Sequence, residues 1–241
     1  MEIFLIGGGR AARAAHEPFV RACGGGPIVV FALDDDDLDI ARWETTLKDA
    51  GATEVTVVPV SSTRPPRPAD LTDAAGVYVA GGLTPEYRDV LVDAGTDWLD
   101  VARANDLPYC GFSAGAAIAA EQALVGGWQT TYNDQTLDVC DPDLAEDLDH
   151  LTILPGLALV PFIVDIHAAQ WGTLYRLTHA VLATGREGWA IDENTVLALS
   201  SNTTPTLHGP GAATPTVHGP GAATHIRRTG PSSTTITVFT A

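Results

Sequence analysis

The chain has 241 residues, a hydrophobic content of 45% and a formal net charge of −17 at pH 7. This length allows a sizeable buried core, and we expect a single domain over residues 1–241. The acidic balance argues against binding to nucleic acid or to an anionic membrane, because both require a basic face. No apolar stretch approaches the roughly 18 residues of a membrane span, and the first residues lack the pattern of a signal peptide.

The first half of the chain alternates between apolar strand-like runs and helical segments. The expected strands occupy residues 2–6, 27–33, 53–60, 76–82 and 107–112. The expected helices occupy residues 11–22, 38–50 and 84–95. This alternation is typical of a mostly parallel sheet covered on both faces. Ligands of such sheets bind at the carboxyl ends of the strands, where a glycine run at 7–9, a glycine pair at 81–82 and Ser113 all fall.

Residues 111–115 read Gly-Phe-Ser-Ala-Gly and fit the pattern G-x-S-x-G. An apolar strand-like stretch precedes them and an Ala-rich helical stretch follows. In this context the pattern predicts a sharp strand-to-helix turn that exposes Ser113 as a strained nucleophile. The next helix points its N-terminus, with its unpaired N–H groups, at the atom that the serine attacks. The alternative is an ordinary helix start that Ser113 caps.

The C-terminal third is expected to be rich in β-structure. Residues 189–200 read as strand, turn and strand, and the tail TTITVFTA reads as a closing edge strand. Residues 205–214 (PTLHGPGAAT) recur almost unchanged as residues 215–224 (PTVHGPGAAT). The Pro and Gly content of this near-duplication predicts a β-hairpin or loop rather than a solenoid. His208 and His218 recur with it, which is weak evidence for metal ligands.

A nucleophilic serine requires a base, and the base requires a partner that orients it. Among the seven histidines, His167 stands out because an apolar stretch precedes it and an expected helix follows. A core histidine bonded to a backbone carbonyl is the equal alternative. Asp165, Asp192 and Glu193 are candidate acids, although residues 192–194 also form an ordinary turn sequence.

Two backbone amides are candidates for stabilising an oxyanion. One belongs to Ala114, directly after the serine, and the other to Gly82 in a glycine turn that frees the backbone from side-chain interference. A rival interpretation rests on residues 7–12, which fit G-x-G-x-x-A after a strand, with Asp34 some twenty residues on. That pattern is a dinucleotide fingerprint. It leaves Ser113 and His167 without a role.

Four segments together resemble peptidase family S51, the serine peptidases that include aspartyl dipeptidase (dipeptidase E) and cyanophycinase. They are LIGGG at the start, AGGLT before a helix, GFSAGA, and GLALVPFIVDIH followed by GWAIDE, and they span residues 3–193 in the family's order. The resemblance implies a three-layer α/β/α sandwich like class I glutamine amidotransferase domains. It also implies Ser113 as nucleophile and His167 as general base, with no metal or organic cofactor.

The orienting acid differs between branches of the family that the chain resembles. Cyanophycinase-like members imply Glu193, whereas dipeptidase-like members take the acid from between the serine and the histidine, where Asp134 is the best candidate. We prefer Glu193 because GWAIDE is the closer match, and Asp192 beside it stays open.

The chain departs from the family pattern after the histidine. Cyanophycinases carry a series of arginines there that serve an Asp-Arg substrate. Here Trp171 and Thr173 replace expected arginines and Arg176 remains, while Ile166 and Leu83 replace polar residues. We therefore do not expect cyanophycin to be the substrate.

The sequence predicts a cytoplasmic serine peptidase that cleaves a small peptide or isopeptide amide through an acyl-enzyme. The three cysteines have no metal-type spacing and are expected to be free thiols. Substrate contacts are expected from Thr84, Asp165, Trp171 and Arg176. Two other hypotheses remain: a binding protein without catalysis on the same fold, and a dinucleotide-binding enzyme that uses Gly7, Gly8 and Gly9. The small substrate is the expected partner, and a homodimer is left open.

Overall fold

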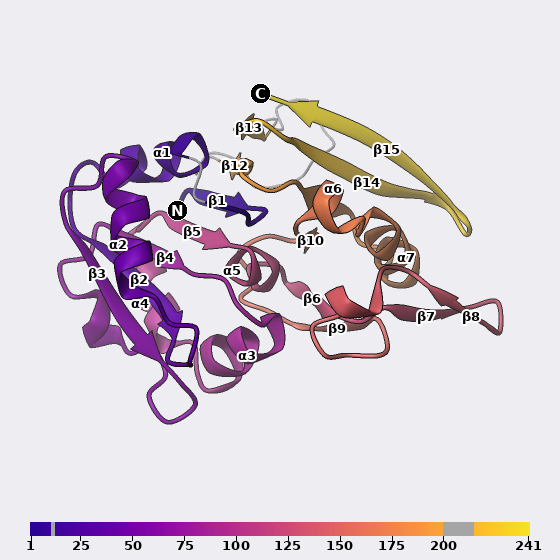
Figure 1. Ribbon diagram of the computed structural model, residues 1–241, viewed down its shortest axis with the longest axis horizontal. Coiled ribbons are helices and arrows are strands. Elements are labelled where there is room, and N and C mark those ends of the chain that lie inside the picture. Colours follow the sequence, from indigo (N-terminus) through magenta and orange to yellow (C-terminus); the bar gives the residue numbers. More distant parts are fainter. Residues whose placement is uncertain (11–12, 200–214) are drawn as a thin grey trace.

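The computed structural model describes residues 1–10, 13–199 and 215–241 (Figure 1). Its main sheet has seven strands in the order β13-β12-β1-β5-β4-β2-β3. The parallel strands are β1 (Ile3–Ile6), β2 (Ile28–Leu33), β3 (Val55–Val60), β4 (Gly76–Val79) and β5 (Tyr109–Phe112). The antiparallel strands β12 (Val196–Leu199) and β13 (Thr216–His218) extend one edge.

The parallel strands read as continuous apolar runs because helices cover both faces of the sheet. Every residue of β1, β2, β4 and β5 is buried. Crossovers between parallel strands are right-handed, so connections that run in opposite directions across the sheet lie on opposite faces. The helices of one face are α1 (Arg13–Ala22) and α2 (Ile40–Asp49). Those of the other are α3 (Thr84–Arg88), which continues as a π-helical turn over Asp89–Asp93, and α4 (Asp97–Ala104). The predicted mostly parallel sheet is confirmed.

A second sheet has four strands in the order β10-β11-β14-β15. These strands are β10 (Ile163–Asp165), β11 (Gly188–Ile191), β14 (Ala222–Gly230) and β15 (Ser233–Thr240). The helix α7 (Leu174–Thr184) packs against all four of them, and the long β14–β15 hairpin runs along the outside in yellow (Figure 1). Two small ribbons complete the strands: β6 (Gln122–Gly126) with β9 (Thr152–Pro155), and β7 (Gln129–Tyr132) with β8 (Gln135–Asp138).

The expected strand, turn and strand at 189–200 is present, but its two strands belong to different sheets. β11 lies in the four-stranded sheet and β12 in the seven-stranded one, so residues 192–195 carry the chain across the junction. The second copy of the near-duplication crosses in the same way, from β13 to the start of β14. The first copy, with His208, lies outside the described residues.

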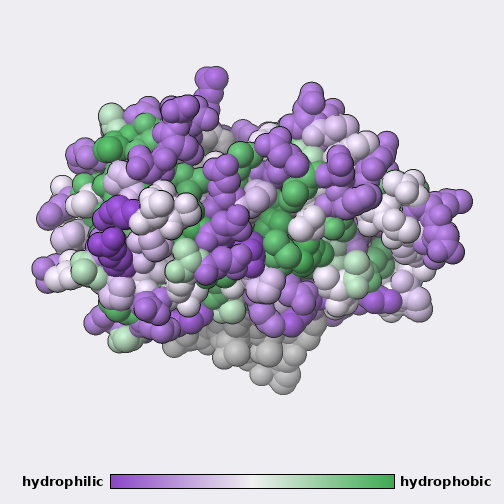
Figure 2. Space-filling view, turned by 90° about the horizontal axis from the view of Figure 1, so that it is seen from below, coloured by the Kyte–Doolittle hydropathy of each residue, from purple (hydrophilic) through white to green (hydrophobic). Residues whose placement is uncertain are grey.

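In the part of the chain that the structure describes, no helix has the length and apolar character needed to cross a membrane. Hydrophilic residues cover much of the face seen in Figure 2, in keeping with the charge of −17. Cys23, Cys110 and Cys140 are free thiols, as expected, and burial raises the pKa of Cys23 to about 12.

Candidate active site

Ser113 lies on the sharp turn that the G-x-S-x-G pattern predicts. It follows β5 and precedes the short helix α5 (Ala114–Ile118), with φ 51° and ψ −112°. A serine rarely adopts a positive φ, so the surrounding structure imposes this strain. A Cβ on Gly111 would lie 2.3 Å from the carbonyl oxygen of Gly115, which is why glycines flank the turn. The Ser113 side chain makes no capping hydrogen bond, so the alternative of a plain helix cap does not apply.

The hydroxyl of Ser113 is hydrogen-bonded to His167, and His167 is hydrogen-bonded in turn to Glu193. The distance from Ser113 Oγ to His167 Nε2 is 2.9 Å. The distance from His167 Nδ1 to Glu193 Oε1 is 2.7 Å. In a neutral imidazole with its proton on Nδ1, the serine O–H donates to Nε2 and the Nδ1–H donates to the carboxylate. The three side chains therefore form one continuous hydrogen-bonded chain.

His167 and Glu193 come from neighbouring strands of the second sheet. His167 follows β10 by two residues, and Glu193 follows β11 by two residues. β10 and β11 pair in parallel, so the segments that leave them emerge at the same edge. The amide of His167 donates to the carbonyl of Gly7 (2.8 Å), and the amide of Glu193 donates to the side chain of Gln170 (2.9 Å). These bonds fix the backbone under both functional side chains.

The glycine turn after β1 packs directly against the histidine and the acid. A Cβ on Gly8 would lie 2.2 Å from His167 Cε1, and a Cβ on Gly9 would lie 2.8 Å from Glu193 Cβ. Both glycines also have positive φ, at +96° and +97°. The glycines that suggested a dinucleotide-binding turn thus make room for the side chains of His167 and Glu193. The closing alanine of that pattern, Ala12, lies outside the described residues.

Trp171 stacks on the imidazole of His167. It ends the short helix α6 (Ala168–Trp171), and the two rings are parallel within 8° with centroids 3.9 Å apart. The Gly8 backbone also lies close to the His167 ring, so both a backbone turn and an indole pack against the imidazole. Nothing in the sequence pattern indicates this stack.

Burial sets the protonation state of the histidine. It lowers the pKa of His167 below the ordinary value of 6.5, while the hydrogen bond and the charge of Glu193, and the charge of Asp165, partly oppose the shift. His167 is therefore neutral at pH 7, which is the state in which Nε2 can accept a proton.

A cavity of about 920 Å³ opens onto these residues. Ser113, His167, Trp171 and Glu193 line it together with Gly82. The remaining wall carries charged side chains of both signs, contributed by Arg10, Asp35, Asp36, Asp37, Asp39, Arg42 and Glu86. The volume falls in the range of roughly 300–1,000 Å³ that is common for small-ligand sites.

The two predicted oxyanion donors lie beside the serine. A Cβ on Gly81 would be 2.9 Å from Ser113 Cβ, so the glycine turn touches the nucleophile. Among the hydrogen bonds of the described residues, the amide of Gly82 has no acceptor. Ala114 is the first residue of α5, and its N–H has no acceptor within that helix.

The structure brings one of the four predicted substrate contacts to the cavity, namely Trp171. Asp165 and Arg176 form a buried ion pair at 2.7 Å, with exposed fractions of 1% and 2%. Buried charges need partners, and these two satisfy each other. Thr84 donates both its amide and its hydroxyl to the carboxylate of Glu146.

The other candidate acids lie in different positions from Glu193. Asp192 accepts backbone hydrogen bonds from Ala169 (3.1 Å) and Ala222 (2.9 Å), so its carboxylate ties α6 to β14. Asp134 is an exposed residue in the turn between β7 and β8. Glu193 is the acid that the fold brings to His167.

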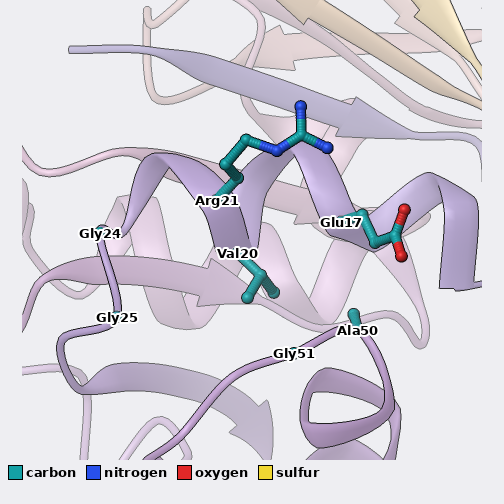
Figure 3. Close-up of a pocket in the computed structure, with 7 residues that line it drawn as sticks. All are labelled: Glu17, Val20, Arg21, Gly24, Gly25, Ala50 and Gly51. Carbon is teal, nitrogen blue, oxygen red and sulfur yellow. The ribbon is translucent and has the colours of Figure 1, made fainter.

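A metal centre and a second hollow are the other candidates for a functional site. Within residues 1–10, 13–199 and 215–241, no group of His, Cys, Asp and Glu side chains could hold a metal ion. A separate hollow of about 420 Å³ lies beside the C-terminal ends of α1 and α2 (Figure 3). Its lining is Glu17, Val20, Arg21, Gly24, Gly25, Ala50 and Gly51. None of the predicted site residues lines this hollow.

Two solved structures are similar to this chain. The crystal structure of a peptidase from an acI-B1 Actinobacterium is similar with a TM-score of 0.64 and 18% identity, covering 99% of this chain and 96% of that one. A putative peptidase E protein from Listeria monocytogenes EGD-e is similar with a TM-score of 0.55 and 18% identity, covering 83% and 94%. These similarities show the fold, which is the expected amidotransferase-like α/β architecture.

No curated protein sequence matches the chain at a significant level. The sequence model of peptidase family S51 matches residues 3–206. This match covers most of the 241 residues and includes Ser113, His167 and Glu193. The chain therefore belongs to peptidase family S51, a family of serine-type peptidases.

Proposed function

We propose that this chain hydrolyses a small peptide or isopeptide amide through Ser113, His167 and Glu193. The observation that carries the proposal is the hydrogen-bonded chain of these three side chains, with distances of 2.9 and 2.7 Å, at the wall of a cavity of about 920 Å³. A nucleophile, a base and an orienting acid in this order are what amide hydrolysis by a serine enzyme requires.

Acylation begins when Ser113 Oγ attacks the substrate carbonyl carbon and its proton passes to His167 Nε2. The carbonyl oxygen becomes an oxyanion, which the amides of Gly82 and Ala114 stabilise. Glu193 holds the imidazole by its Nδ1–H and stabilises the imidazolium that forms. The C–N bond then breaks, and His167 gives its proton to the leaving amine, which leaves an acyl group on Ser113.

Deacylation repeats these steps with water. His167 removes a proton from a water molecule, the resulting hydroxide attacks the acyl carbon, and the same two amides stabilise the second oxyanion. The C–Oγ bond then breaks, and Ser113 regains its proton from His167. Every protein group in these reaction steps belongs to the described residues.

The environment of the histidine supports a substrate other than cyanophycin. Trp171 stands where a substrate-binding arginine was expected, and it covers the imidazole. Arg176 is buried and paired with Asp165, so its charge is not available to a substrate carboxylate. The proposal is therefore a peptidase of small substrates without an arginine-rich acid-binding subsite.

The experiment that tests this function combines labelling and turnover. The purified protein is treated with a fluorophosphonate and analysed by peptide mass spectrometry, and a panel of dipeptides and isopeptides is screened for hydrolysis. Ser113→Ala should lower kcat/KM by roughly 10⁴-fold or more and abolish labelling. The exposed Ser62→Ala serves as the matched control and should leave both unchanged. Full hydrolysis by Ser113→Ala, or a label on another residue, would contradict the proposal.

A further inference from the structure

The glycine turn that carries the Gly82 amide is anchored from a distant part of the chain. Thr84 follows this turn as the first residue of α3, and it is 2% exposed. Its amide donates to Glu146 Oε2 at 2.9 Å, and its hydroxyl donates to Glu146 Oε1 at 3.1 Å. One carboxylate therefore accepts two hydrogen bonds from one residue, which fixes both the backbone and the side chain of Thr84.

Burial of the Glu146 carboxylate in this contact removes part of its hydration. Burial raises the pKa of Glu146, and the two hydrogen bonds from Thr84 are the main opposing effects, followed by the charge of Arg176. A half-buried carboxylate that lost these donors would keep the desolvation cost without compensation. Breaking the hydrogen bonds between Thr84 and Glu146 would therefore be unfavourable, so we expect this contact to persist.

The segment that carries Glu146 is in turn held by the buried ion pair. Arg176 Nη1 donates to the carbonyl of Leu144 at 3.2 Å, and its Nη2 donates to Asp165 Oδ1 at 2.7 Å. Asp165 is the last residue of β10, two positions before His167. Polar contacts thus link Asp165 to Arg176 and Arg176 to Leu144, and two residues further along the chain Glu146 binds Thr84 beside the turn that carries the Gly82 amide.

We infer that Glu146 is a positioning residue for the reaction at Ser113: by fixing Thr84 it holds the Gly82 amide toward the oxyanion. The inference rests on the proposed function. The turn touches Ser113 at Gly81 and carries the amide of Gly82, two residues before Thr84. Glycines provide little stiffness of their own, so an external anchor decides where this amide points. Glu146 acts on the transition state through the turn and does not touch the substrate.

The test compares Glu146→Gln with a control variant in the helical segment that Thr84 begins. Asp93→Asn removes a carboxylate that binds Arg88 at 2.6 and 2.7 Å, at the other end of the α3 segment and away from the glycine turn. For both variants kcat and KM are measured on the best substrate of the screen. The inhibition constant of the matching dipeptide boronic acid, which mimics the tetrahedral intermediate, and the Tm are also measured.

Glu146→Gln should lower kcat about 10- to 100-fold with KM within about twofold, because misplacing an oxyanion donor affects the transition state. The boronic acid should bind more weakly by a similar factor. Asp93→Asn should lower the Tm and leave kcat and boronic acid affinity within about twofold. Equal losses of kcat in both variants, or kcat of Glu146→Gln within twofold of wild type, would overturn the inference.

Thr84 provides a second pair of variants if Glu146→Gln fails to fold. Thr84→Val removes one of the two hydrogen bonds at nearly constant volume and should lower kcat about 3- to 10-fold. Thr84→Ser keeps both donors and should restore kcat. Equal kcat in these two variants would overturn the inference. Failure of the proposed function is distinguishable, because it appears as hydrolysis that survives Ser113→Ala whatever the Glu146 and Thr84 variants do.

Discussion

The nucleophile and its base are positioned in two different ways. Ser113 is placed by its own neighbours, since the strained turn, the flanking Gly111 and Gly115 and the start of α5 lie within five consecutive residues. His167 and Glu193 are placed by contacts from segments distant in sequence, including the turn after β1. The nucleophile is therefore mainly a local feature of the seven-stranded sheet, whereas the base and the acid depend on how the second sheet meets the first.

This difference separates two kinds of substitution. A change near Ser113 alters a turn whose strain and flanking glycines are visible in the local sequence, although neighbouring strands also bind its backbone. A change around His167 can act through a contact with no local signal. The following variants test whether the His167 environment is as dependent on distant contacts as the structure indicates, in order of expected effect.

The largest effect is expected from Glu193→Gln. The amide keeps the volume but cannot stabilise the imidazolium by charge, and it can favour the wrong tautomer of His167. We expect kcat to fall roughly 10³- to 10⁴-fold. The matched control is Asp192→Asn, which weakens structural bonds to Ala169 and Ala222 and should lower the Tm while keeping kcat within about tenfold. Steady-state kinetics and thermal unfolding measure both; the reverse ranking of kcat would identify Asp192 as the acid.

Gly8→Ala should give the next largest loss. The added Cβ would lie 2.2 Å from His167 Cε1 and 2.4 Å from Nε2, the atom that binds Ser113, so the ring or the glycine turn must shift. We expect kcat/KM and the rate of fluorophosphonate labelling to fall about 10²-fold.

Gly51→Ala is the control for Gly8→Ala because Gly51 has a similar positive φ of +104° and no neighbour within 4 Å of an added Cβ. It should lose about 1–2 kcal/mol of stability and no activity. Equal activity of Gly8→Ala and Gly51→Ala would show that His167 tolerates displacement. It would contradict the view that distant contacts position His167.

Trp171 offers a smaller and graded test. An indole face stabilises an adjacent cation by about 0.5–1 kcal/mol, so the stack favours the imidazolium that forms during the reaction. Trp171→Leu should lower kcat about two- to fivefold, and Trp171→Phe should restore much of it. Single-turnover acylation rates measure this effect. Equal acylation rates in the Leu and Phe variants would contradict it.

The smallest effect is a displacement of the pH profile. Activity requires neutral His167, so kcat/KM should fall as the pH drops through the pKa of His167 in the folded protein. Burial lowers that pKa below 6.5, and the acid limb should therefore have its midpoint below pH 6.5. Glu193 raises the pKa, so the residual activity of Glu193→Gln should show a midpoint at still lower pH. An acid limb above pH 6.5 in the wild type would contradict the assignment of His167 as a buried base.

The same contrast explains what the sequence could predict. The parallel strands and the turn at Ser113 were predictable because burial on both faces and contacts within a few residues leave a visible pattern. The choice of Glu193 over Asp192 was not, since it depends on β14 returning to bind the Asp192 carboxylate. The preference for Glu193 came from the family resemblance, and its role in catalysis stays a prediction.

Charged residues near the site were the least predictable. The sequence suggested substrate contacts for Asp165 and Arg176, which instead face each other in the interior, and an ion pair between a strand and a helix leaves no local pattern. The glycines at 7–9 showed that the backbone comes close to something, but not that it is His167 rather than a phosphate. Glu146 gave no signal at all, because its partner Thr84 is 62 residues away.

The passage of residues 192–195 from one sheet to the other has a consequence for how the enzyme fails. The nucleophile and the base follow strands of different sheets, and the chain passes between these sheets at residues 192–195 and again between β13 and β14. One apolar core includes residues of both sheets, so a small shift of one sheet against the other would lengthen the bond between Ser113 and His167 before this core opened. The turnover rate should therefore report the alignment of the two sheets more sensitively than any spectroscopic measure of secondary structure.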